Sequence, residues 1–112
     1  TIDLKTQGSR LFVDVARIYA LANGVRSANT AERLRVVGQR IKRSLSAIEG
    51  DIAAFRFVQA IRLRRQLESI RDGGDPNRID PYSLDELQQR ILRESLRQAV
   101  SLQSRLKVDY RP

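Results

Sequence analysis

The chain has 112 residues, a formal net charge of +8, and no histidine, cysteine or methionine. Without histidine, imidazole general bases, Ser-His or Cys-His nucleophiles and imidazole metal sites are excluded. Without cysteine, disulfides and thiolate metal sites are excluded as well. The length is that of one domain, and the lack of methionine leads us to expect a piece of a longer protein. The basic balance favours an anionic partner, such as a phosphate, a nucleotide or an acidic protein surface, although arginines on solvated helix faces would give the same charge.

The first predicted helix follows a short leading segment. We expect residues 1–7 to be extended, and Ser9 to be the N-cap of a helix that ends at Asn23-Gly24, because glycine favours the left-handed conformation after a last turn. Asp14 and Arg17 lie three residues apart on the flank of the apolar side, which predicts a half-buried ion pair. The apolar residues recur at helical spacing: Leu11, Phe12, Val15, Ile18, Tyr19 and Ala22.

A shorter helix is predicted next, with Asn29 or Thr30 as its cap. Gly38 lowers helix stability by about 1 kcal/mol relative to alanine, so we expect a break before Ser44 or Ser46. The narrow apolar edge of this helix consists of Leu34, Val37 and Ile41. The densest basic run in the chain is either a solvated face or an anion contact, and it comprises Arg35, Arg40, Lys42 and Arg43.

A long helix from Ser46 to Gly73 organises the predicted fold. Ser46 and Glu49 have the spacing of a capping box, and Gly73 can end the helix in the left-handed conformation. Such a helix spans roughly 40 Å, at about 1.5 Å per residue, so we expect the other helices to pack against it. Its apolar stripe comprises Ile48, Ile52, Ala54, Phe55, Val58, Ile61, Leu67 and Ile70.

A proline- and glycine-containing loop over residues 72–83 separates this helix from the last one. Ser83 and Glu86 have the spacing of a second capping box, and the last helix should run to about Val108. Residues 110–112 would then form a tail. The apolar residues of the last helix are Leu84, Leu87, Ile91, Leu92, Leu96, Val100, Leu102 and Leu106. The pattern predicts two long helices, one medium helix and one short helix, joined by short turns. We therefore expect an all-α fold, namely an antiparallel four-helix bundle with one short helix. This bundle would be a single domain over residues 1–112.

The carboxylates do not have the spacing of a catalytic nucleotidyltransferase site. Gly8-Ser9 resembles the pair that opens such a site, but two carboxylates two residues apart must follow to hold Mg²⁺. Asp14 is followed by Ala16 at that spacing. Glu49 and Asp51 have the right spacing but diverge on a helix. We therefore expect no catalytic residues and no metal site in this chain.

Polar residues in the middle of the long helix are the best site candidates. Arg62 and Gln66 lie one turn apart, and a mid-bundle arginine needs a partner. The candidate partners are Asp14 and Asp80. In a structural interpretation, Arg62 and Arg65 hold the loop at Asp80, and Asp14 pairs with Arg17. In a functional interpretation, Arg62 and Gln66 line a cleft together with Arg17 and bind a phosphate or a nucleotide through the planar guanidinium groups.

Six segments in chain order carry a family resemblance. They are residues 2–5 with Gly8, residues 14–17, Asn29-Thr30 with Arg33-Leu34, residues 62–67, residues 77–81 with Leu84, and residues 102–106. Together they resemble the putative nucleotidyltransferase substrate-binding domain. In that family the domain is a C-terminal helical bundle of larger bacterial signalling proteins. These proteins carry a nucleotidyltransferase-like domain related to the uridylyltransferases of the nitrogen regulatory protein, often preceded by CBS and cyclic-nucleotide-binding domains.

The resemblance implies a non-catalytic, cytoplasmic domain, cut from the C-terminus of such a protein, that helps to bind nucleotide or acceptor protein. Mg²⁺ and a nucleoside triphosphate would belong to the catalytic domain upstream. Arg65 stands where many relatives have histidine. The resemblance marks Lys5, Asp14, Arg17, Arg62, Gln66 and Asp80 as signature positions and assigns no role to any of them. We predict substrate or nucleotide binding by Lys5, Arg17, Arg62 and Gln66, and structural polar pairing by Asp14, Arg65 and Asp80.

Two alternatives come from other functional classes. One is a regulatory or dimerisation bundle without substrate contact, in which the chain forms a homodimer. The other is a basic nucleic-acid-binding module, which the aromatic content of 5% disfavours because few rings are available to stack on bases. We expect no membrane association, because the sequence has no apolar run of about 18 or more residues.

Overall fold

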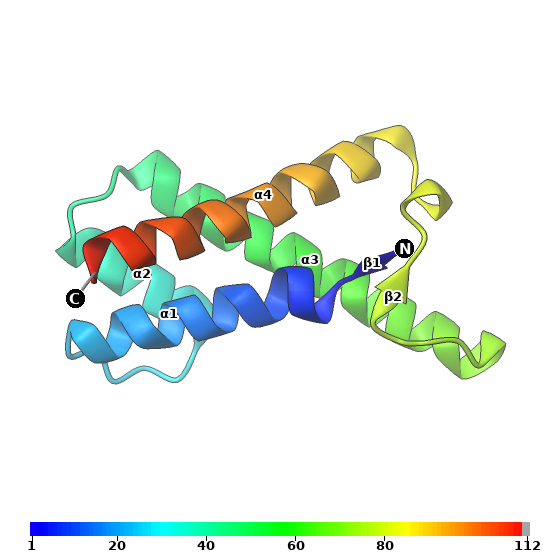
Figure 1. Ribbon diagram of the computed structural model, residues 1–112, viewed down its shortest axis with the longest axis horizontal. Coiled ribbons are helices and arrows are strands. Elements are labelled where there is room, and N and C mark those ends of the chain that lie inside the picture. Colours follow the sequence, from blue (N-terminus) through cyan, green and yellow to red (C-terminus); the bar gives the residue numbers. More distant parts are fainter. Residues whose placement is uncertain (111–112) are drawn as a thin grey trace.

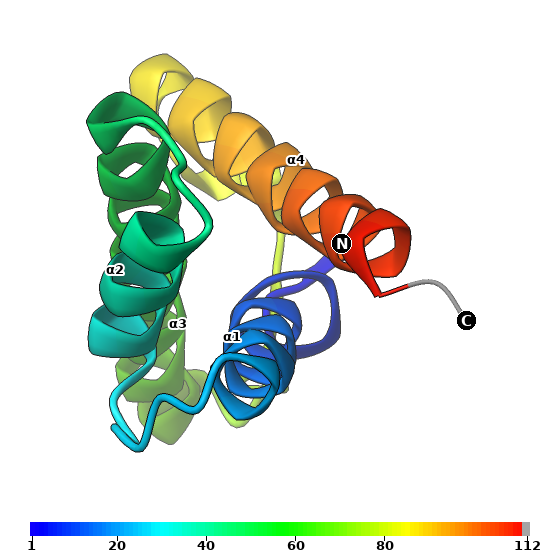
Figure 2. The same ribbon diagram turned by 90° about the vertical axis from the view of Figure 1, so that its left-hand side faces the viewer.

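The computed structural model describes residues 1–110 and shows a bundle of four helices (Figure 1). The helices are α1 (Arg10–Ala22), α2 (Thr30–Arg40), α3 (Leu45–Asp72) and α4 (Glu86–Asp109). α3 runs opposite to α1 and α4, and the end view places α2 and α3 on one side of the bundle (Figure 2). The predicted all-α bundle is therefore confirmed. The last two residues of the predicted tail, 111–112, lie outside the described residues.

The N-terminal segment departs from the prediction at Leu4. β1 (Ile2–Asp3) pairs antiparallel with β2 (Arg78–Ile79), in a register that places Ile2 opposite Ile79. The chain then forms η1 (Lys5–Ser9), a π-helical turn that continues directly into α1. The expected extended conformation is thus limited to the short strand, because residues from Leu4 onward are helical.

Ser9 occupies the N-cap position of α1 as predicted, but its side chain makes no capping hydrogen bond, because its backbone is already helical at φ −56° and ψ −40°. The capping acceptor lies further upstream. The Asp3 carboxylate accepts hydrogen bonds from the backbone N–H groups of Lys5 and Thr6, each at 3.0 Å. These backbone hydrogen bonds, with that from Thr6 the largest cause, lower the pKa of the Asp3 carboxyl below its ordinary value.

The N-caps of α3 and α4 each lie two residues from the predicted cap, and a capping box forms only at α4. Ser44 caps α3 in place of Ser46, and its hydroxyl accepts a backbone hydrogen bond at 3.1 Å. Asp85 caps α4 in place of Ser83 and forms a reciprocal capping box with Gln88. The Ser83 hydroxyl is engaged elsewhere, since it donates to the carbonyl of Asp80, the residue before η2 (Pro81–Ser83).

The other predicted helix ends are confirmed. The Asn29 side chain caps α2 by accepting a hydrogen bond from the backbone of Glu32 at 2.9 Å. Gly24 and Gly73 adopt the left-handed conformation, at φ +67° and +70°, after α1 and α3 respectively. The expected break between α2 and α3 lies at residues 41–44, and Lys42 within it has a positive φ of 59°.

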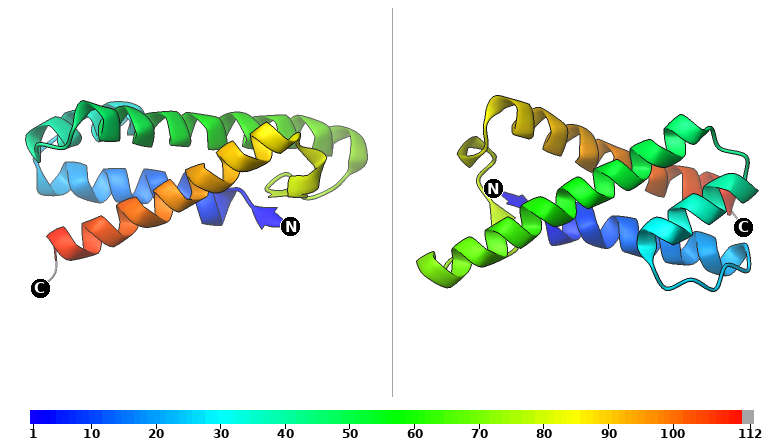
Figure 3. Two further views of the ribbon diagram at one scale, coloured as in Figure 1. Left: turned by 90° about the horizontal axis from the view of Figure 1, so that it is seen from above. Right: turned by 180° about the vertical axis from the view of Figure 1, so that it is seen from behind.

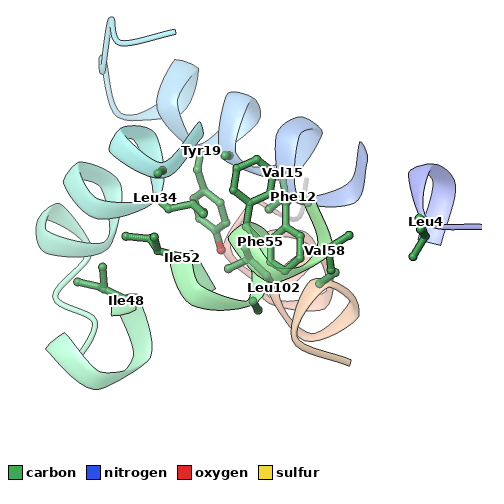
Figure 4. Close-up of a cluster of buried hydrophobic side chains, with 14 of the residues drawn as sticks. Leu4, Phe12, Val15, Tyr19, Leu34, Ile48, Ile52, Phe55, Val58 and Leu102 are labelled. Atoms are coloured by element: carbon green, nitrogen blue, oxygen red, sulfur yellow. The ribbon is translucent and has the colours of Figure 1, made fainter. Parts of the chain in front are cut away.

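The core lies where α1, α2 and α4 cover α3. Phe12 and Phe55 pack at its centre with ring centroids 5.7 Å apart (Figure 4). The predicted stripe of α3 is buried from Ile48 to Ile61 but not beyond, because Leu67 and Ile70 are 59% and 81% exposed. Some predicted core residues of the other helices are also exposed, namely Ile18, Leu87, Ile91 and Val100.

Two glycines allow close contact between helical segments. A Cβ atom at Gly8 would lie 2.7 Å from Cγ1 of Val58, so η1 packs tightly on α3. A Cβ atom at Gly38 would lie 2.5 Å from Cγ1 of Ile48, so the C-terminal end of α2 also packs tightly on α3. Within residues 1–110, no helix is both long enough and apolar enough to cross a membrane.

Candidate functional site

Arg62 joins three segments of the chain. Its Nε donates a hydrogen bond to Oδ1 of Asn77 at 3.1 Å, and its Nη1 donates one to Oγ of Ser9 at 3.2 Å. The backbone N–H of Leu4 donates to the carbonyl of the same Asn77 at 2.7 Å. Arg62 thus holds the loop after α3 and the start of α1 together. The structural interpretation, in which Arg62 holds the loop at Asp80, is confirmed, but the expected carboxylate partner is wrong, because Asn77 and Ser9 accept these hydrogen bonds instead of Asp14 or Asp80.

Arg65 holds the same loop from one turn further along α3. Its side chain is 13% exposed, its Nε donates to the carbonyl of Arg78 at 2.8 Å, and its Nη1 lies 2.8 Å from Oδ2 of Asp72. The hydrogen bond from Arg65 lowers the pKa of the Asp72 carboxyl, and the same bond raises the pKa of the Arg65 guanidinium. Asp80 instead accepts a hydrogen bond from the backbone N–H of Tyr82 at 3.0 Å and caps η2.

The remaining predicted binding residues have different surroundings. Arg17 lies 3.6 Å from Asp14 with side chains 56% and 42% exposed, so the predicted ion pair forms and is about half-buried. Lys5 is exposed, and Gln66 is half-buried. Arg62 contacts Ser9, about 12 Å along the helical axis from Arg17 at 1.5 Å per residue. These contacts do not link Arg17 to Arg62, and a binding role for Lys5, Arg17, Arg62 and Gln66 stays a prediction.

A surface groove lies between η1, α1 and α4, with a volume of about 610 Å³. Leu11, Leu96 and Val100 give it an apolar lining, and Arg93 and Arg97 stand one turn apart on α4. Its other lining residues, Thr6, Gln7 and Ser101, carry hydroxyl and amide groups. Volumes of roughly 300–1,000 Å³ with an apolar lining and few polar groups are typical of small-molecule sites.

The charge of this groove is positive and accessible. Arg97 lies 3.5 Å from Glu94, but both side chains are about 70% exposed, at 71% and 69%, so solvent screens this contact. The planar guanidinium groups of Arg93 and Arg97 can therefore turn toward phosphate oxygens. Sequence reasoning missed these residues because it treated α4 only as a source of core leucines. The signal was present in the i, i+4 spacing of Arg93 and Arg97 around Leu96.

A buried ion pair joins the turn between α2 and α3 to the first part of α3. Asp51 is 3% exposed, accepts a hydrogen bond from Nε2 of Gln98 at 2.8 Å, and has Nη2 of Arg43 at 3.1 Å. Burial raises the pKa of the Asp51 carboxyl, while the hydrogen bond from Gln98 and the charge of Arg43 oppose that shift. The network ties the α2–α3 turn to α4. The sequence analysis missed it because Arg43 was grouped with a basic run that was expected to be a solvated face or an anion contact.

Comparisons with known proteins place this geometry in a family. A search of curated proteins and a search of solved structures gave no match. A family model described as "Putative nucleotidyltransferase substrate binding domain" matches residues 1–110. Because the match covers almost the entire chain, it confirms the resemblance seen in the six sequence segments. The chain belongs to the family of putative nucleotidyltransferase substrate-binding domains.

Proposed function

We propose that this chain is a non-catalytic helical domain that binds the nucleotide substrate beside the catalytic domain of a uridylyltransferase-like nucleotidyltransferase. The full-length protein that contains this domain would act in cytoplasmic signal transduction, with CBS or cyclic-nucleotide-binding domains upstream. Mg²⁺ would be held by the catalytic domain. The observation that carries the proposal is the groove beside α4, which combines an apolar lining with Arg93 and Arg97.

The chemistry of the groove suits a nucleotide. A base or ribose can pack on Leu11, Leu96 and Val100, while the guanidinium groups of Arg93 and Arg97 form charge-assisted hydrogen bonds with phosphate oxygens. Lys5 directly precedes groove residue Thr6, so its ammonium group is the predicted binding group nearest to the groove in sequence.

In this proposal Arg62 acts differently from Lys5. Arg62 positions η1 through Ser9, and η1 supplies Thr6 and Gln7 to the groove. Its contribution to binding is therefore indirect. Arg65 acts in the same way on the loop after α3, through the carbonyl of Arg78.

Calorimetric titration of the chain with ATP, UTP, GTP and CTP at low ionic strength tests the proposal. We expect weak but saturable binding of at least one nucleotide, because exposed guanidinium groups are screened by salt and the catalytic domain is absent from the titration. The double substitution Arg93→Gln/Arg97→Gln should weaken binding at least about tenfold, a loss of roughly 1.4 kcal/mol.

A matched control removes two arginines outside the groove. Arg26 and Arg56 are exposed, and the double substitution Arg26→Gln/Arg56→Gln lowers the net charge by the same amount. If both double variants lose affinity equally, binding follows net charge and the groove is not the site. If none of the four nucleotides binds the unsubstituted chain, a regulatory bundle without substrate contact is the better functional interpretation.

A further inference from the structure

The end of α3 extends beyond the rest of the bundle (Figure 3). On this end, the exposed fractions of Leu63, Leu67 and Ile70 are 57%, 59% and 81%. These residues follow Ala60 at spacings of three, four and three, so all four share one face of the helix. We call Ala60, Leu63, Leu67 and Ile70 the α3 stripe.

The opposite face of this part of α3 is covered by the loop that follows α3. Arg65, which is only 13% exposed, contacts the carbonyl of Arg78 in the returning loop. At about 100° per residue, Arg65 lies on the side of α3 away from the stripe. The loop therefore packs on one face and leaves the apolar face uncovered. A contiguous exposed apolar face of this kind is typical of an interaction surface.

From this geometry we propose that the α3 stripe docks an amphipathic helix of another protein domain whose apolar side is bordered by aspartate or glutamate. The spacing of the stripe is that of one side of a two-helix seam, which one partner helix can fill. A hollow of about 480 Å³ beside Leu67 and Ile70 is also lined by Arg64, Glu68 and Arg71.

The charges beside the stripe select the partner. Arg64 and Arg71 follow one border, and the uncharged Gln59 and Gln66 follow the other. Arg64 is paired with Glu68 at 3.2 Å, whereas Arg71 has no carboxylate within 4.0 Å among residues 1–110. A partner with acidic borders would pair with Arg71 and could compete for Arg64.

A second copy of this chain is a poorer occupant. It would bring a border carrying the same two arginines, together with a net charge of +8 of its own. Like charges across a helix seam disfavour association. The proposed partner is therefore a different domain.

A synthetic peptide of about 18 residues, long enough for five helical turns, is the probe. It carries leucine along one face and glutamate on both borders, and a second peptide replaces every glutamate with lysine. Fluorescence anisotropy of the labelled peptides, at concentrations where they are monomeric, measures binding to the 112-residue chain. We expect the acidic peptide to bind and the basic peptide not to bind.

Substitutions in the stripe then locate the binding. The double variant Leu67→Gln/Ile70→Gln should weaken binding of the acidic peptide at least about tenfold. A control, Leu21→Gln/Leu45→Gln, replaces leucines that are 75% and 71% exposed elsewhere and should keep the parental affinity. Arg71→Gln should weaken binding a few-fold, and this loss should disappear at high salt.

Two results would overturn the proposal. One is equal binding of the acidic peptide to the parent chain and to the Leu67→Gln/Ile70→Gln variant, which would show non-specific attraction to a basic protein. The other is a dimer in sedimentation equilibrium that the same variant dissociates, which would make a second copy the occupant. The stripe shares no residue with the groove beside α4, so failure of the nucleotide titration leaves this test unaffected.

Discussion

Arg62 donates a hydrogen bond to the hydroxyl of Ser9 across 3.2 Å, which links the middle of α3 to the junction between η1 and α1. Ser9 is 4% exposed, and its hydroxyl also contacts the carbonyl of Leu4 at 3.4 Å. The second hydrogen bond of Arg62, to Asn77, fixes the loop that pairs with β1. One side chain thus sets the path of both segments that border α3.

Replacing Arg62 with alanine should lower the free energy of unfolding by about 1–3 kcal/mol, because two hydrogen bonds from a charged group are lost and Ser9 and Asn77 lose a partner. Urea unfolding followed by circular dichroism measures this change. Arg64→Ala is the control. Arg64 is half exposed at 50% and pairs only with Glu68 of its own helix, so its loss should be about 0.5 kcal/mol or less.

A double-mutant cycle of Arg62→Ala with Ser9→Ala separates the hydrogen bond from the other effects of each change. The coupling energy should favour the pair. If the two changes are additive, Arg62 stabilises the protein mainly through Asn77 or through packing of its stem.

Gly8→Ala and Gly50→Ala should change stability in opposite directions. A Cβ atom at Gly8 would lie 2.7 Å from Cγ1 of Val58, so η1 or α3 must shift, at a cost of about 1–3 kcal/mol. Gly50 lies within α3, and the nearest atom to its Cβ, Nε2 of Gln98, is 3.8 Å away. There alanine should stabilise the protein by about 0.5–1 kcal/mol through its higher helix propensity. Thermal unfolding measures the midpoint temperature of both variants. If the two midpoints shift in the same direction relative to the unsubstituted protein, the close packing of η1 on α3 is contradicted.

Replacing Tyr19 with phenylalanine should weaken the attachment of the end of α4 to α1. The Tyr19 hydroxyl donates to Oδ2 of Asp109 at 2.7 Å, and burial together with this bond raises the pKa of Tyr19 above its ordinary value of 10.0. The cost should be about 0.5–1.5 kcal/mol at neutral pH. Because the folded state holds the phenol proton more tightly, the parent protein should lose stability as pH rises above 10.0.

Ultraviolet titration of tyrosine ionisation gives an independent readout of Tyr19. The parent chain contains three tyrosines, and one should ionise late. The Tyr19→Phe variant should lack that late phase, while Tyr82→Phe, at an 83% exposed position, should retain it. A late phase that persists in Tyr19→Phe would show that another tyrosine is protected.

Helical periodicity predicted the four helices because each one buries an apolar side against another. It also overextended the buried stripe of α3 to Leu67 and Ile70, since periodicity identifies the apolar face of a helix but not the element that covers it. Where α1 and α4 no longer cover α3, the same pattern continues in solvent. The displaced caps have a local cause, because serines at residues 44 and 46 are both competent caps in sequence.

The polar contacts were harder to predict than the helices. The need of Arg62 for a partner was apparent from the sequence, but Asn77 lies 15 residues away, across a loop whose path is set by pairing with β1. Asp51 entered the sequence analysis only as a carboxylate two residues from Glu49, and the position of Arg43 and Gln98 in space makes it a buried acceptor. Such contacts depend on tertiary structure, which spacing along the chain does not encode.

Asp51 and Asp72 should affect the pH dependence of stability with opposite signs. Burial raises the folded-state pKa of Asp51 above its ordinary value of 3.8, so between these two pKa values the folded protein binds more protons than the unfolded chain. Its contribution to the free energy of unfolding therefore falls as pH rises through that window and is constant above it. For Asp72, the hydrogen bond from Arg65 lowers the pKa, so its stabilising contribution is present above 3.8 and is lost as pH falls through the folded value.

Asp51→Asn and Asp72→Asn separate these two effects in urea unfolding from about pH 2 to about pH 7. The free energy of unfolding of Asp51→Asn minus that of the parent should rise with pH above 3.8 and then level off. The same difference for Asp72→Asn should fall with rising pH below 3.8 and stay constant above. An Asp51→Asn curve parallel to that of the parent would show that the Asp51 carboxyl titrates alike in the folded and unfolded states. Burial between Arg43 and Gln98 would then not control its ionisation.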